Sequence, residues 1–168
     1  MTDCLSLYQS EDELPLLLEI AGLAKTSLGA VTKGKSSSSL APFLSFMQKF
    51  IYLHGSDIEP NRNNTVHEPM QVMAKGLMLL SYDAVRSCAE SSEDSDGIAS
   101  PMFDTLSTCA KKCPLFLLSL SRDGQPAGEI IRSSFETAPM TMQSNEMDVA
   151  LSSIRFLKEL VSFCSGHN

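Results

Sequence analysis

Residues 101–118, PMFDTLSTCAKKCPLFLL, decide the fold of this chain, because they combine a helix, a sharp corner and the start of a second helix. Ser100 is a good helix cap, and Pro101 suits the first helical position, where its missing N–H costs nothing. Pro114 then predicts a corner, since its ring clashes with the preceding turn. The apolar face predicted for the first of these helices consists of Phe103, Leu106, Ala110 and Cys113.

The chain after the corner predicts two more helical segments. Residues 115–120 begin the partner helix, 122–126 interrupt it with Arg-Asp-Gly-Gln-Pro, and 128–135 resume it. Asn145 and Asp148 start the last helix. This last helix has two apolar faces, which predicts that it lies between two neighbours, as in a stacked layer. One face carries Met147, Leu151, Ile154, Val161 and Cys164, and the other carries Val149, Phe156, Leu160 and Phe163.

The N-terminal half predicts three helices. The first spans 10–28, or begins at Leu14 with Pro15 in its first position, and Gly29 ends it. The second starts after Ser39 and stops at Gly55. The third, 70–89, follows a capping box of Thr65 and Glu68 and is the longest expected in the chain. Phe43, Met47, Phe50 and His54 mark the face of the second helix, and flexible loops are expected near 30–39, 55–64 and 90–99.

Composition agrees with an all-α fold. The 168 residues are 43% apolar and 20% charged, so the chain can bury a sizeable core. Aromatic residues make up only 7%, and the mixture of Leu, Ser and Met suits helices better than a β-sandwich. The length fits one domain, or three to four helical hairpins of roughly 40 to 47 residues each. We expect residues 1–168 to form a single helical-repeat segment.

The charge and the cysteines limit the function classes. A net charge of −7 and a pI near 4.9 argue against general affinity for nucleic acid, and the acidic surface either favours basic partners or serves solubility. Five cysteines, an odd number without paired spacing, predict reduced thiols in a cytosolic or nuclear protein. The N-terminus has no secretion signal, and no apolar run is long enough for a transmembrane helix.

No pattern in the sequence predicts catalysis. His54, His67 and His167 fall at a helix end, a cap and the C-terminus, without a nucleophile motif beside them. Cys109 and Cys113 share a helix face and supply half a metal site, but core thiols explain them better because a second pair is missing. Phosphate-binding glycine motifs are absent from the sequence. We therefore expect no enzyme activity, no metal and no cofactor.

Two basic pairs are the candidate residues for binding a protein partner. Lys111 and Lys112 are consecutive, although their position at a helix C-terminus also suits the helix dipole. Arg155 and Lys158 project from the last helix three residues apart, where they form an exposed basic ridge or pair with Glu159 and loop acids.

The amino-acid sequences of several segments resemble those of a known protein family. The segments FLSFMQKFIYLHGSD, MFDTLSTCAKKCP and ALSSIRFLKELV, with the helix 70–89 between the first two, resemble consecutive HEAT repeats from the C-terminal half of importin-β superfamily transport receptors, in the branch of transportin-SR and importin-thirteen. The resemblance covers about 43–166. It implies a HEAT- or armadillo-like helical solenoid that carries protein cargo through nuclear pores under control of the GTPase Ran, and it implies location in cytoplasm and nucleus.

The resemblance also bears on the cargo. In importers of SR proteins, a helix at the place of 103–114 aligns basic residues at i, i+4 and i+8 to bind phosphorylated Arg-Ser tails. The matching positions here are Asp104, Thr108 and Lys112, of which one is basic and one would repel phosphate. We therefore expect that the fold is kept while phosphorylated Arg-Ser recognition is not. A self-contained helical bundle with an adaptor role is the alternative to the transport receptor.

Overall fold

The chain is all-α in the part that the structure describes. The computed structural model describes residues 40–59, 71, 72, 74–76, 78, 79, 82, 96–120, 126–141 and 147–166, and the single positions 15, 19, 22 and 26. These residues form no strand, and the prediction of an all-α fold is confirmed. The helices are α3 (Leu40–Ile58), α5 (Asp96–Lys112), α6 (Pro114–Ser119), α7 (Glu129–Thr141) and α8 (Met147–Gly166).

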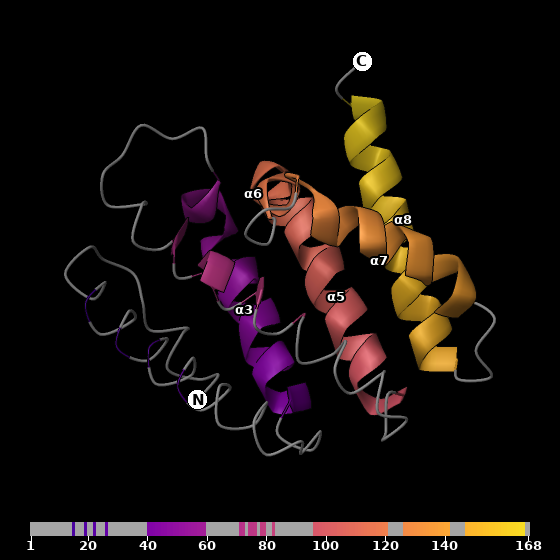
Figure 1. The fold of residues 1–168 in the computed structure, drawn as a ribbon, viewed down its shortest axis with the longest axis horizontal. Coiled ribbons are helices and arrows are strands. Elements are labelled where there is room, and N and C mark those ends of the chain that lie inside the picture. Colours follow the sequence, from indigo (N-terminus) through magenta and orange to yellow (C-terminus); the bar gives the residue numbers. More distant parts are fainter. Residues whose placement is uncertain are drawn as a thin grey trace.

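Helix α5 lies at the centre, with α3 against one side and α8 against the other (Figure 1). All three run in the same direction, from the lower edge of Figure 1 to the upper edge. The short α6 follows α5 at the upper edge, and α7 then returns in the opposite direction and packs against α8. The described helices thus form a layer of parallel helices with a returning helix beside it.

The core lies between α3, α5 and α8. Phe103 of α5 meets Phe156 of α8 with ring centroids 5.8 Å apart, and both side chains are buried. Each such ring contributes roughly 1.5–3 kcal/mol through its burial. The buried side chains that α3 gives to the core include Leu44, Met47, Phe50 and Ile51.

Two hydroxyl contacts fix the position of α5 within this layer. The Thr105 hydroxyl lies 3.2 Å from the Leu44 carbonyl on α3 and 2.8 Å from the Pro101 carbonyl on its own helix. On the other side, the hydroxyls of Ser100 and Ser152 lie 3.0 Å apart, between α5 and α8. Small polar residues let the helices approach closely while their polar atoms keep partners inside the core.

The predicted corner at Cys113 and Pro114 is confirmed. Helix α5 ends at Lys112, Cys113 leaves helical geometry with φ −148° and ψ 62°, and Pro114 occupies the start of α6. The Glu59 carboxylate, just past the end of α3, accepts hydrogen bonds from the backbone N–H of Leu115 at 2.9 Å and of Phe116 at 3.0 Å. A side chain from α3 thereby satisfies two of the free N–H groups that every helix start leaves open.

The prediction that Gly55 stops the second helix is wrong. Helix α3 continues through Gly55 to Ile58, so residues 55–58 of the expected loop are helical. Gly55 is buried, and a Cβ placed on it would lie 2.6 Å from Cβ of Lys112. Gly55 therefore allows two helices to approach closely because it has no side chain. It does not end the helix.

The start of α5 is also different from the prediction. The helix begins at Asp96, so the expected loop near 90–99 is wrong for its last residues, and Pro101 lies inside the helix and not in its first position. Ile98 in the added turn is 2% exposed. Burial of this side chain stabilises a turn that local capping signals do not predict.

Helices α7 and α8 differ from the prediction at their ends. Helix α7 begins after Gly128, which has a φ of +80°, and runs past the expected end at Phe135 to Thr141. Helix α8 begins at Met147, two residues after the expected start. Buried Ala138 in the last turns of α7 accounts for its greater length, because the apolar face continues.

Several predictions fall outside the described residues. They include the loop 30–39, residues 122–125 of the interruption, and most of the first helix 10–28. In the expected helix 70–89, residues 71, 72, 74–76, 78, 79 and 82 are helical, and its ends lie outside the described part.

Candidate protein-binding surface

Lys111 and Lys112 are both exposed in the last turn of α5. The Lys112 ammonium lies over the Tyr52 ring of α3, 4.6 Å from its centroid, and Tyr52 is 60% exposed. A cation over an exposed ring gains about 0.5–1 kcal/mol. Lys112 is therefore held against α3, and a partner that binds its charge must compete with this ring or share it.

Arg155 and Lys158 are exposed on α8. Arg155 Nη1 lies 3.7 Å from Asp104 Oδ1 on α5, which is a surface ion pair of about 0–1 kcal/mol. Lys158 forms no ion pair with any of the described residues. Of these two cations on α8, Arg155 is thus paired across the helix interface, and Lys158 has no ion-pair partner among the described residues.

The four candidate cations do not form one basic patch. Arg155 pairs with Asp104, which is two turns before Lys112 on α5, and eight residues of helix span roughly 12 Å. Thr108 lies between these positions, and its hydroxyl donates to the Asp104 carbonyl at 2.8 Å. The row Asp104, Thr108 and Lys112 therefore offers an acid, a hydroxyl bonded to its own helix, and a cation stacked on Tyr52.

His54 is a buried side chain in the core of α3. Its Nδ1 lies 3.8 Å from Asp57 Oδ2, and its ring lies 5.3 Å from the Phe50 ring. Burial lowers the pKa of His54, and the nearby Asp57 carboxylate only partly opposes this effect. His54 therefore favours the neutral form inside the fold, while His67 and His167 lie outside the described residues.

Cys109 and Cys113 are free and buried where α5 meets the corner. The hydrogen bond with Cys113 is the largest cause that raises the pKa of Cys109, and burial is the second. A thiol with a raised pKa is a poor nucleophile because the thiolate is the reactive form. The two sulfurs therefore act as core side chains, as the sequence predicts.

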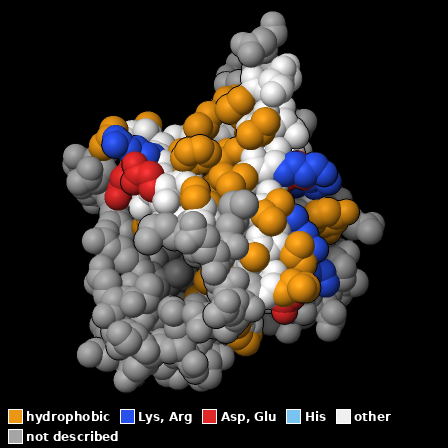
Figure 2. Space-filling model, turned by 90° about the vertical axis from the view of Figure 1, so that its right-hand side faces the viewer, with side chains coloured by type: hydrophobic (Ala, Val, Ile, Leu, Met, Phe, Trp, Pro, Cys, Tyr) orange, Lys and Arg blue, Asp and Glu red, His pale blue; other side chains and the backbone are white. Residues whose placement is uncertain are grey.

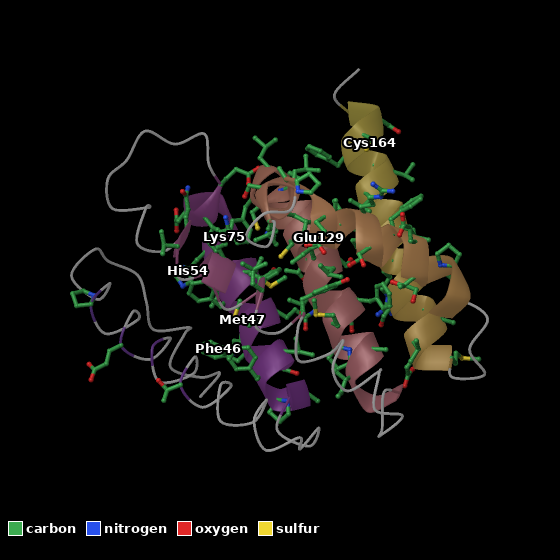
Figure 3. The ribbon with its side chains drawn as sticks, in the orientation of Figure 1. Phe46, Met47, His54, Lys75, Glu129 and Cys164 are labelled. Atoms are coloured by element: carbon green, nitrogen blue, oxygen red, sulfur yellow. The ribbon has the colours of Figure 1, made fainter. Side chains whose placement is uncertain are left out.

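Three of the reactive side chains in the described part lie on different helices. His54 lies on α3, Glu129 at the start of α7 and Cys164 near the upper end of α8 (Figure 3). Among the described residues, no three His, Cys, Asp or Glu side chains are grouped so that they hold a metal ion.

The outer face of α8 carries several exposed hydrophobic side chains. Hydrophobic side chains gather on the side of the molecule where α7 and α8 lie (Figure 2). The inner face of α8 contacts the core through Val149 and Phe156, but the second apolar face is uncovered. The sequence predicts that the last helix lies between two neighbours, and α8 does contact both α5 and α7, but the outer apolar face is exposed, so the prediction is wrong for that face. Its exposed members are Met147, Leu151, Ile154, Val161 and Cys164.

Sequence reasoning missed two residues that shape this surface. Tyr52 lies outside the apolar face of α3, and this position in the sequence could have predicted that its ring is exposed. Glu59 gave no signal, since its partners, Leu115 and Phe116, are more than 50 residues away in the sequence.

None of the described helices is both long enough and apolar enough to cross a membrane. Comparison of the chain with protein-family models, curated proteins and solved structures finds no match.

Proposed function

We propose that this chain is a non-catalytic, protein-binding segment of a HEAT-like helical solenoid, and that it belongs to a nuclear import receptor of the importin-β type that carries protein cargo under the control of Ran. Its mechanism is non-covalent. Stacked helices present an extended surface to cargo, and cargo affinity is coupled to Ran through the flexing of the whole stack. The receptor acts in cytoplasm and nucleus.

The layer of α3, α5 and α8 is the observation that supports this proposal. The three helices run in the same direction, and α7 returns between α5 and α8 in the chain. Parallel helices joined by returning helices are what a stack of helical hairpins requires, because each hairpin repeats the direction of the previous one. The uncovered outer face of α8 agrees with an end layer of such a stack.

A self-contained helical-bundle adaptor is the second candidate. The burial of α5 on both sides favours it as much as it favours the solenoid, since a central helix is common to both folds. The two candidates differ in behaviour. A solenoid segment with uncovered apolar ends aggregates as an isolated chain, whereas a bundle is a soluble monomer that unfolds cooperatively. Light scattering and denaturant unfolding of the chain separate them.

A Ran-binding assay tests the transport role. The full-length natural protein that contains this chain is immobilised and incubated with Ran loaded with GTP or with GDP. An import receptor retains Ran-GTP and not Ran-GDP, because the nucleotide sets the state of the switch segments that a partner contacts. Equal retention of both forms, or retention of neither, would remove the transport-receptor proposal and leave the adaptor.

A further inference from the structure

The exposed face of α8 follows a regular spacing. Its members are separated by 4, 3, 4, 3 and 4 residues, which is the alternation of a heptad pattern. This is the spacing of a seam along which two helices pack side by side, and it is narrower than the broad apolar face of a helix that covers a globular core. The members are Met147 (75% exposed), Leu151 (42%), Ile154 (45%), Lys158 (exposed), Val161 (61%) and Ser165 (exposed), and we call this row the outer stripe.

The outer stripe lies opposite the face by which α8 is anchored. Val149 and Phe156 are buried on the inner face, and Phe156 packs on Phe103 of α5. The stripe is thus held on a helix whose position is fixed by the core. A preorganised helix face loses little conformational entropy when a partner binds to it. From Met147 to Ser165 the stripe extends over 18 residue steps, or roughly 27 Å, which is enough for a partner helix of about five turns.

Lys158 is the one charged member of the outer stripe, whose other members are apolar except for Ser165. It occupies a seam position between Ile154 and Val161, and it forms no ion pair with the described residues. A single Lys at a seam position selects partners and register, because its ammonium needs an acceptor once the seam is closed. The occupant must therefore place an acidic side chain opposite Lys158.

The same charge argues against a second copy of this chain as the occupant. In a parallel, in-register pair of α8 helices, Lys158 faces Lys158 of the other copy. In an antiparallel pair centred on the stripe, the two Lys158 side chains lie within about one helical turn of each other. Both arrangements bring like charges into a closing seam, which disfavours them.

We propose that the outer stripe of α8 binds one amphipathic helix of a different sequence, which lies along α8, fills the seam with apolar residues at 3-4 spacing and presents a Glu or Asp to Lys158. This inference rests on the protein-binding part of the proposed function and is independent of Ran. It names the chemistry of one partner: an acidic amphipathic helix.

The test uses the whole chain and two synthetic helical peptides of about three heptads. Both carry Leu and Ile at the seam positions and Ala and Gln elsewhere. One has Glu at the central seam position, and the other has Lys there. Affinities are measured by fluorescence anisotropy with four proteins: the natural chain, Lys158→Glu, Ile154→Glu and, as a matched control, Val72→Glu, which replaces an apolar side chain that is 67% exposed on another helix.

The natural chain and Val72→Glu are expected to bind the Glu peptide at least about tenfold more tightly than the Lys peptide, since a closed ion pair replaces a like-charge contact. Lys158→Glu is expected to invert this preference. Ile154→Glu is expected to weaken both peptides by about tenfold or more. Circular dichroism of each variant shows whether the fold is retained, and the inversion by Lys158→Glu does not depend on the Ile154 variant.

Three results would overturn the inference. They are binding of both peptides with equal affinity, equal weakening by Val72→Glu and Ile154→Glu, and self-association of the natural chain that Ile154→Glu abolishes, which would make a second copy the occupant. The outcome is separate from that of the Ran assay. If the chain prefers the Glu peptide but the full-length protein does not bind Ran, this inference stands and the transport role is removed. If the protein binds Ran-GTP but the chain has no peptide preference, the transport role stands and this inference is removed.

Discussion

Gly55 of α3 and Lys112 of α5 mark the closest approach found at a described glycine. A Cβ on Gly55 would lie 2.6 Å from Cβ, 3.3 Å from the backbone carbon and 3.4 Å from the carbonyl oxygen of Lys112. None of these atoms is the free end of a flexible side chain, so the contact is relieved only by a shift of one helix. The same close approach places the Lys112 ammonium over Tyr52, one turn before Gly55.

We predict that Gly55→Ala destabilises the fold by about 1–3 kcal/mol, because overpacking outweighs the gain of up to about 1 kcal/mol that Ala brings to a helix. Urea unfolding followed by circular dichroism measures the change. Gly22→Ala is the matched control, since a Cβ on Gly22 meets nothing within 4 Å. It should be neutral or stabilising. Equal unfolding midpoints for the two variants would show that the helices do not approach at Gly55 as described.

Much of the fold could be predicted from local signals. The corner at Pro114 follows from the geometry of proline, and the inner face of α8 follows from helical spacing. The errors have a common cause. The predicted stop at Gly55 is wrong because this residue packs against Lys112 of another helix, and the predicted start at Ser100 is wrong because Ile98 is buried. In both places tertiary packing, and not the local sequence, sets the helix boundary.

The candidate surface was less predictable than the fold. The exposure of Lys111, Lys112, Arg155 and Lys158 agrees with their charge, but the pairing of Arg155 with Asp104 joins residues about 50 positions apart. Spacing along one helix cannot reveal such a contact. The apolar spacing on α8 revealed its second face, but whether a neighbour covers that face depends on tertiary structure and not on period.

Glu59 provides a second prediction, because its carboxylate joins the end of α3 to the start of α6. Glu59→Ala removes the acceptor of the Leu115 and Phe116 N–H groups and should lower the free energy of unfolding by about 1–2 kcal/mol. Glu59→Gln keeps one oxygen acceptor and should cost less. Thermal and urea unfolding of both variants measure the difference.

Glu136→Ala is the control for the loss of a carboxylate. Glu136 pairs with Arg132 at 3.1 Å, and both side chains are more than 60% exposed, so the loss should stay below about 0.5 kcal/mol. If Glu59→Ala costs no more than Glu136→Ala, the carboxylate of Glu59 does not cap α6.

His54 makes stability depend on pH. Its pKa is lowered in the folded chain, so at pH values below about 6.5 the unfolded chain binds more protons than the folded one. The free energy of unfolding should therefore be unaffected by His54 above this pH, and it should fall as the pH decreases from about 6.5 toward the lowered folded pKa. Urea unfolding between pH 7.5 and 5 measures the slope. In His54→Gln the part of the slope due to this residue should vanish; an unchanged slope would assign it to other groups.

Lys112 allows the cargo prediction to be tested. Only this one of the three positions Asp104, Thr108 and Lys112 carries a positive charge, and the cation is stacked on Tyr52. Lys112→Glu should therefore change the affinity for a phosphorylated Arg-Ser peptide by less than roughly threefold. If a row of basic residues instead bound the phosphate in a bidentate manner, the same substitution would cause a large loss of affinity. Fluorescence anisotropy measures the affinities for the phosphorylated and the unphosphorylated peptide.

The control for this substitution is Tyr52→Leu, which removes the ring under the ammonium and keeps the charge of Lys112. Because the cation–π contact is worth about 0.5–1 kcal/mol, Tyr52→Leu should change stability slightly and leave peptide affinity unchanged. A large loss of phosphopeptide affinity in Lys112→Glu, with none in Tyr52→Leu, would mean that Lys112 binds phosphate through its charge alone. In that case the repulsion by Asp104 is weaker than its position suggests, because Arg155 at 3.7 Å neutralises it.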